Sequence, residues 1–253
     1  MPQLDRNPIQ DILVIGSSGV CLASATDTWP SQIVGGLMSA IMALGRDTLG
    51  SELEGLDFKD GKIYCVANDK GICAVAFSSE KLPGVIVKLI LEDVLEKFMA
   101  EYGETLRSWD GNLKAFEGIH SYLRDIISRP FVETAIRVFF SRAGLEGVVL
   151  YDLEEGRVLF SLLPTWFMSM KKMATVAAMI ASFANKLSEE VGGGRVETVI
   201  FGGKEKWIVV LVKGRLCLMN FLPRTEKYDM NSLVEASSLL LDFTLKITEK
   251  GGG

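Results

Sequence analysis

The side chains that most often carry out chemistry in proteins are few in this chain and are not grouped. His120 is the single histidine, so an arrangement of serine, histidine and aspartate has one candidate base. It lies within residues 116–122, in a pattern typical of an amphipathic helix, and no nucleophile motif is nearby. We therefore expect a partly exposed structural histidine rather than a catalytic one.

The cysteines also favour a structural rather than a catalytic role. None of them forms a C-x-x-C pair, and each lies inside an apolar run, where a free cysteine behaves as a small hydrophobic residue. Zinc needs clustered Cys and His ligands, and that spacing is absent. We expect buried, reduced thiols, no metal site and a reducing, cytoplasmic location. The four residues are Cys21, Cys65, Cys73 and Cys217.

Phosphate-binding loops are also not supported. The lysine of Gly202-Gly203-Lys204 is not followed by the Ser or Thr of a P-loop and lacks the earlier glycine. Residues 192–194 follow a helical pattern and precede a strand, which is the reverse of a dinucleotide-binding turn. The sequence therefore predicts a protein that is not an enzyme and has no cofactor. Nothing selects an arginine finger among Arg46, Arg142, Arg195 and Arg224.

Composition limits the class of protein further. The chain has 253 residues, of which 48% are hydrophobic and 23% charged, enough for a packed core in one large or two ordinary domains. The net charge of −5 argues against a broad nucleic-acid-binding surface. No stretch reaches the roughly 20 predominantly apolar residues of a membrane-spanning helix, and residues 1–10 do not resemble a secretory signal. Peripheral membrane association is left open.

An internal repeat is the most informative feature. Residues 62–77 align without a gap on residues 206–221, with lysine, cysteine and phenylalanine coinciding, and both segments read as strand, turn, strand. Residues 11–24 and 147–161 form a second pair of such hairpins. The same order of elements in both halves predicts two copies of one structural unit.

Helices follow from apolar spacing. In the first half we expect a helix from about Pro30 whose core face carries Ile33, Leu37, Ala40, Ile41 and Leu44. A second stripe runs from Val87 to Tyr102, and further helices are expected over 113–127 and 132–143. In the second half the central helix carries Trp166, Met170, Met173, Ala177, Ile180, Ala184 and Leu187. The last helix carries Leu233, Ala236, Leu240, Phe243 and Ile247.

Each half therefore reads β-β-α-β-β-β followed by a helix. Hairpins imply antiparallel pairing, so the predicted fold class is α/β of the α+β kind, with two five-stranded antiparallel sheets, each with one central crossing helix and flanking helices. Strands 208–212 and 216–219 are almost continuously apolar, which is typical of strands at the centre of a sheet.

This element order resembles two related families. Residues 1–128 resemble a longin domain, and residues 129–253 resemble a roadblock (dynein light chain 7) domain, particularly in segments 146–156 and 196–203. The resemblance implies a non-catalytic scaffold or regulator that binds a Ras-like small GTPase or a related longin/roadblock partner. Such domains pair through sheet edges and central helices, so an intramolecular pseudo-dimer and a homo-oligomer are both left open.

Two features suggest where a partner binds. Small residues that let helices approach closely follow both central helices, and Trp109 lies in a polar link where it could anchor a partner. The alternative for the small residues is that they face the sheet. A small-molecule sensor with a pocket between sheet and helix, and a structural assembly subunit, are the other functions considered. The small residues are Gly35, Ser39, Ala43, Ala174, Ala178, Ala181 and Asn185.

Overall fold

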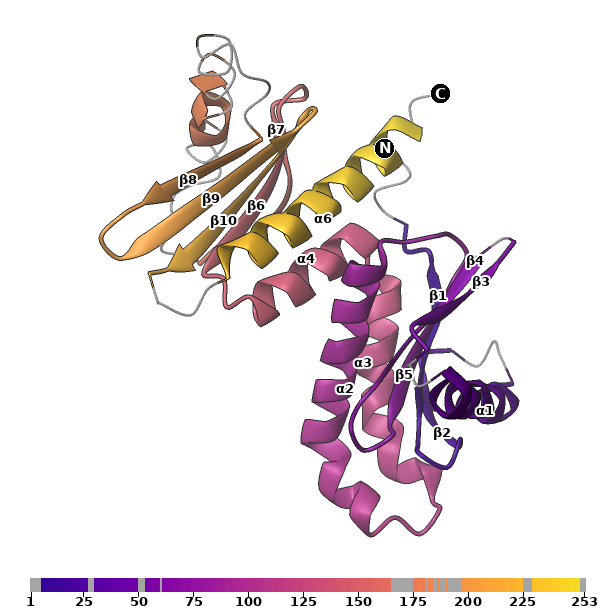
Figure 1. The fold of residues 1–253 in the computed structure, drawn as a ribbon. Coiled ribbons are helices and arrows are strands. Elements are labelled where there is room, and N and C mark those ends of the chain that lie inside the picture. Colours follow the sequence, from indigo (N-terminus) through magenta and orange to yellow (C-terminus); the bar gives the residue numbers. More distant parts are fainter. Residues whose placement is uncertain are drawn as a thin grey trace. The chain divides into compact units, whose positions relative to one another are not determined.

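The chain forms two compact units. The computed structural model describes residues 6–26, 30–49, 53–59, 61–164, 175–180, 182–183, 186, 190, 197–224 and 229–250. One unit spans Pro2–Ala135 and the other Ile136–Gly253. Each contains one five-stranded antiparallel sheet, as Figure 1 shows. The predicted division at residues 128/129 stays a prediction.

In the first unit, one helix lies on one face of the sheet and two lie on the other. The sheet has the order β2-β1-β5-β4-β3; α1 packs on β1 and β2, α2 on β4 and β5, and α3 on β1 and β2. The elements are β1 (Ile9–Ile15), β2 (Cys21–Ser24), α1 (Ser31–Leu49), β3 (Gly55–Phe58), β4 (Gly61–Ala67), β5 (Cys73–Ser78), α2 (Gly84–Arg107), the 3-10 turn η1 (Leu113–Phe116) and α3 (Glu117–Ser128).

The second unit repeats this layout. Its sheet has the order β7-β6-β10-β9-β8, α6 packs on β9 and β10, and the helical residues 175–180 contribute Ala177 and Ile180 to the core on the opposite face. Helix α4 (Phe131–Arg142) contains the division between the units. The elements that follow it are β6 (Gly147–Asp152), β7 (Arg157–Leu162), β8 (Thr198–Gly202), β9 (Lys206–Lys213), β10 (Leu216–Pro223) and α6 (Met230–Lys250).

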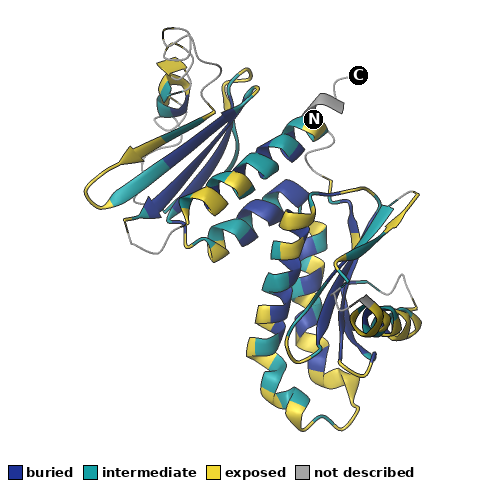
Figure 2. Cartoon of the chain, in the orientation of Figure 1, coloured by how far each residue is buried: buried dark blue, intermediate teal, exposed yellow. Residues whose placement is uncertain are grey.

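The predicted fold class is therefore confirmed. The aligned hairpins are β4–β5 and β9–β10, and the aligned cysteines Cys73 and Cys217 lie in equivalent central strands, each within the core cluster beneath its central helix. Burial follows the same plan, with the central strands buried in both sheets (Figure 2). The repeat seen in the sequence thus corresponds to a repeated core.

Most helical faces were predicted correctly. The stripe on α2 is buried from Val87 to Phe98, and Tyr102 is half-buried. Helix α4 covers the predicted 132–143 segment within one residue, and η1 with α3 replaces the single helix expected over 113–127. On α6, Leu233, Leu240 and Phe243 are buried. Of the stripe expected on the second central helix, Trp166, Met170, Met173, Ala184 and Leu187 lie outside the described residues.

The prediction for α1 is wrong. Ile33, Leu37 and Leu44, which were expected in the core, are 72%, 59% and 64% exposed. Met38 and Met42 instead face the sheet and join its core cluster. The helix is apolar on both sides, and the sheet covers only its inner face. The outer face therefore remains exposed (Figure 2).

Two contacts explain why Met38 and Met42, rather than Ile33 and Leu37, face the sheet. Gly35 packs directly against the β1–β2 turn, and a Cβ atom there would lie 2.7 Å from the carbonyl oxygen of Gly19. Next to it, the amide of Gln32 accepts a hydrogen bond from the N–H of Cys21 at 3.0 Å and donates one to its carbonyl oxygen at 2.8 Å. The amide therefore binds β2 as a neighbouring strand would, and both contacts fix the inner face of α1.

A pair of glycine variants tests this packing. We expect Gly35→Ala to destabilise the protein by about 1–3 kcal/mol, because the added methyl group overlaps backbone atoms. Gly36→Ala is the matched control, since nothing lies within 4 Å of its Cβ position, and alanine in a helix stabilises by about 0.5–1 kcal/mol. Urea unfolding of both variants measures the difference, and equal midpoints for the two would contradict the described contact.

Candidate functional site

The single histidine has a structural role. Nδ1 of His120 lies 2.7 Å from the carbonyl oxygen of Ser24, and because a carbonyl can only accept, Nδ1 carries the proton. Nε of Arg124 donates to the next carbonyl, that of Ala25, at 3.3 Å. Both side chains come from α3 and hold the last residue of β2 and the residue that follows it. His120 is half-buried, in agreement with the partly exposed structural histidine that the sequence predicts.

A buried carboxylate holds the same segment from inside. Asp11 is fully buried on β1 and accepts hydrogen bonds from the N–H groups of Ile12 at 2.8 Å and Thr26 at 3.0 Å and from the hydroxyl of Ser24 at 3.2 Å. Burial raises the pKa of this carboxyl above its usual value, although the hydrogen bonds act in the opposite direction. Its acceptor sites are occupied by the protein itself, so it orders this segment rather than a substrate.

The thiols are all free and buried, as predicted. Burial raises the pKa of Cys21 to about 11 and that of Cys217 to about 12. Since the thiolate is the reactive form, these two residues are poor nucleophiles at neutral pH. Among the described residues, no group of three or more His, Cys, Asp or Glu side chains is arranged to hold a metal ion.

Three hollows lined by described residues open to solvent, with volumes of about 730, 380 and 230 Å³. The largest is lined by Tyr151 and by described helical residues between 175 and 186, including Met179 and Phe183. The ligand-sensing alternative predicted an enclosed pocket between sheet and helix, and none of these three has that form.

The strongest candidate site is the outer face of α1. Ile33, Leu37, Ala40 and Leu44 follow one another along the helix at intervals of three or four residues, so they form one exposed apolar stripe, which we call the α1 surface. No charged residue occurs between Ser31 and Gly45. On the face of the sheet that α1 covers, β3 adds the 54% exposed side chain of Phe58. Contiguous exposed apolar surface of this kind is typical of protein-binding sites.

A related pattern occurs in the second unit. Met179 and Phe183, from its described helical residues, are 66% and 57% exposed, and Phe201 of the edge strand β8 is 39% exposed. Phe201 pairs with Ile208, a member of the core beneath Ala177, so it lies on the same face of the sheet as that helical segment. Both units thus present apolar side chains on a central helical segment and on an edge strand.

The residues predicted to bind a partner lie in several different environments, and their role stays a prediction. Gly35 is buried against the β1–β2 turn, and Ser39 lies near Gly19, so both face the sheet, the alternative that the sequence left open. Ala43 is half-buried and Ala178 exposed. Trp109 is half-buried: its ring packs on Phe116 at a centroid distance of 5.6 Å, and its Nε1–H donates to the carbonyl of Asn112 at 2.9 Å. Ala174, Ala181 and Asn185 lie outside the described residues.

The apolar stripe that forms the α1 surface can be recognised in the sequence, but its spacing alone predicts that these residues face the core. The signal that separates the two faces is the pair Gly35 and Gln32, because a glycine and a long amide one turn apart suit close contact with a strand edge.

No described helix is long and apolar enough to cross a membrane.

Comparison with known proteins finds partial structural likeness alone. No family model and no curated protein matches the chain. Among solved structures, Myxococcus xanthus MglB is 16% identical, with a TM-score of 0.39, and the similarity covers 43% of this chain and 84% of that protein. The gliding protein MglB of Thermus thermophilus is 17% identical, with a TM-score of 0.39, covering 47% and 87%. A Roadblock/LC7 domain from Streptomyces avermitilis is 21% identical, with a TM-score of 0.35, covering 41% and 86%.

The fold is longin/roadblock-like. The observation behind this statement is the chain's own topology, since both units have the strand order in which the first hairpin lies beside the last strand and a helix follows the second strand. Which unit is the longin-like one and which the roadblock-like one stays a prediction.

The reactivity of the thiols tests whether the cysteines are buried in the folded protein. We expect Ellman's reagent at pH 8 to react with the folded protein only slowly, because Cys21 and Cys217 are buried and protonated. In 6 M guanidinium chloride all four thiols should react within the mixing time. Rapid reaction of one thiol in the folded state would show that a cysteine is accessible and reopen the case for cysteine chemistry.

Proposed function

We propose that the chain is a non-catalytic scaffold or regulator that binds a Ras-like small GTPase, or a related longin/roadblock partner, through the α1 surface. The observation that supports this most strongly is the exposure of Ile33, Leu37 and Leu44 on a helix whose other face is already packed on the sheet. A helix that is apolar on both sides needs a second covering. The resemblance to longin and roadblock domains makes a GTPase or a related domain the leading candidate for that covering.

Magnitudes indicate what such a surface can contribute. Fully burying one large aliphatic side chain is worth about 1.5–3 kcal/mol, so covering three partly exposed ones contributes on the order of 5 kcal/mol before the costs of association. That corresponds to weak binding on its own. On the same face of the sheet, Phe58 and the outer edge of β3 offer further contacts to a partner, since the main-chain groups of Gly55 and Asp57 point away from β4 in the ladder.

The binding mechanism follows from two-state linkage. A regulator that prefers one nucleotide state of a GTPase shifts the population toward that state by its differential affinity.

The direct experiment titrates the full chain against the small GTPases of its own source, each loaded with GDP or with a GTP analogue, by calorimetry. Binding to none of them, with a longin/roadblock partner recovered instead, would favour the second form of the proposal.

A charge placed in the α1 surface tests which face binds. We expect Leu37→Asp to weaken partner binding at least tenfold, which is about 1.4 kcal/mol, because a carboxylate would be desolvated in an apolar contact. Stability should change little, since the side chain is 59% exposed. Calorimetric titration of the bound partner measures the loss.

Val85→Asp is the matched control for Leu37→Asp. Val85 is another exposed apolar side chain, 52% exposed, but it lies at the beginning of α2 and not on the α1 surface. Its variant should bind like the unmodified chain. Equal losses for the two variants would place the contact elsewhere.

A further inference from the structure

The outer edge of β8 directs main-chain groups away from the sheet, and they have no strand partner within the part of the chain that the structure describes. The N–H of Val212 donates to the carbonyl of Glu197, and the N–H of Gly203 donates to that of Lys206, both at 2.8 Å. Because antiparallel pairs alternate, every second residue of β8 bonds to β9, and Thr198, Ile200 and Gly202 turn their N–H and C=O groups outward. No other described strand pairs with β8 on that side.

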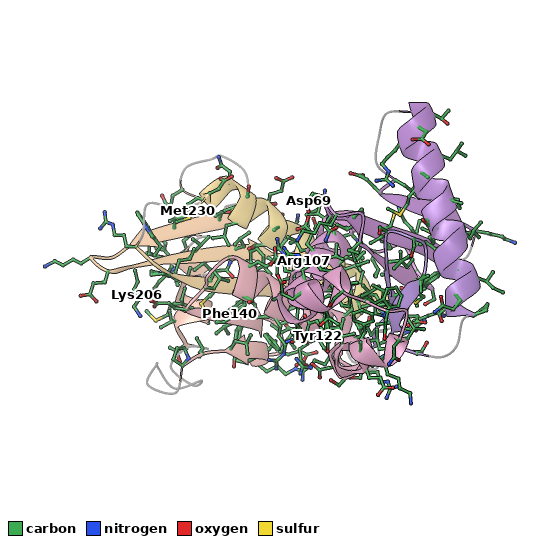
Figure 3. The ribbon with its side chains drawn as sticks, turned by 90° about the horizontal axis from the view of Figure 1, so that it is seen from below. Asp69, Arg107, Tyr122, Phe140, Lys206 and Met230 are labelled. Carbon is green, nitrogen blue, oxygen red and sulfur yellow. The ribbon has the colours of Figure 1, made fainter. Side chains whose placement is uncertain are left out.

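A groove runs beside this edge on the α6 face of the sheet. It has a volume of about 380 Å³, and Ile200, itself 46% exposed, contributes to both the edge and the groove. The volume lies within the usual range for small binding pockets, so the groove can take an apolar side chain of a bound segment. Its other lining residues come from the first turns of α6 (Figure 3 labels Met230): Met230, Asn231, Val234, Glu235, Ser238 and Leu239.

The charge in this groove is acidic. Nζ of Lys213 lies 2.6 Å from a carboxylate oxygen of Asp242 and 3.1 Å from the hydroxyl of Ser238, so that cation is already neutralised. Glu235 is exposed and has no ion pair among the described residues. A segment with a basic side chain therefore complements the groove.

From these three observations we propose that β8 and the groove beside α6 bind an extended peptide segment of another protein, with alternating apolar side chains and one basic residue. The segment adds to the sheet as a strand, with main-chain hydrogen bonds to Thr198, Ile200 and Gly202, one apolar side chain in the groove and its cation at Glu235. Strand addition of this kind takes affinity from the backbone and specificity from the side-chain pockets. This surface belongs to the second unit and is distinct from the α1 surface.

A second copy of this chain fits the groove less well. Its own β8, Thr198–Gly202, carries no basic side chain, so it leaves Glu235 without a counter-charge. An exposed edge can nevertheless pair with another copy, and the experiment must distinguish the two occupants.

The test uses the full chain and a defined probe. A fluorescein-labelled nine-residue peptide of alternating threonine and valine, with a central leucine and one lysine, is titrated by fluorescence anisotropy, alongside the same peptide with glutamate in place of lysine. We expect the lysine peptide to bind about two- to fivefold more tightly, the range of an exposed ion pair. Glu235→Lys should reverse that preference. Glu117→Lys, the same charge change at an exposed site on α3, should leave it unchanged.

A second variant tests the main-chain contacts. Ile200→Pro removes an outward N–H that takes no part in the β8–β9 ladder, and it should weaken both peptides while circular dichroism shows an unchanged fold. No binding of either peptide up to 1 mM, or a preference unaffected by Glu235→Lys, overturns the proposal. So does sedimentation showing a dimer that Ile200→Pro dissociates and that the peptide does not displace, because a second copy then occupies the edge.

Discussion

The contact between Gly35 and the β1–β2 turn decides which surface the first unit presents. Because α1 carries apolar side chains on both sides, the hydrophobic effect alone does not choose its orientation. A missing Cβ atom does, since only Gly35 lets the helix approach the carbonyl of Gly19 so closely, and the paired hydrogen bonds of Gln32 then hold that side against Cys21. The larger aliphatic residues are left outside as a consequence of backbone geometry rather than of their own hydrophobicity.

The strands and the repeat could be predicted from the sequence because their cause is local. Hairpin turns rich in glycine and short apolar runs specify antiparallel pairing, and the coincidence of Cys73 with Cys217 reflects equivalent central positions under a helix. The orientation of α1 could not be predicted from periodicity, because two apolar stripes on one helix give the same signal. The groove beside α6 was missed for a different reason: it depends on which edge of a strand points outward, and that depends on ladder register.

The side chains that could take part in catalysis instead make contacts that stabilise the fold. Asp11, His120 and Arg124 all act on the end of β2 and the two residues after it, Ser24 to Thr26, so this segment is held from the sheet on one side and from α3 on the other. The buried thiols fill core positions in the same way. Asp11 and the thiols are buried as well as structural, whereas His120 and Arg124 reach the same segment from positions open to solvent.

The hydrogen bonds along the outer side of β2 have one more consequence. Gln32 satisfies both main-chain groups of Cys21, and His120 satisfies the carbonyl of Ser24, so this border of the sheet offers little to an incoming strand. Of the two border strands described in the first unit, β3 is therefore the one that remains available for edge-to-edge growth. Pairing at one border joins two sheets into one larger sheet, whereas a sheet that pairs at both borders can be extended further at each end. The amide of Gln32 and the imidazole of His120 thus occupy main-chain groups that a strand pairing with β2 would need.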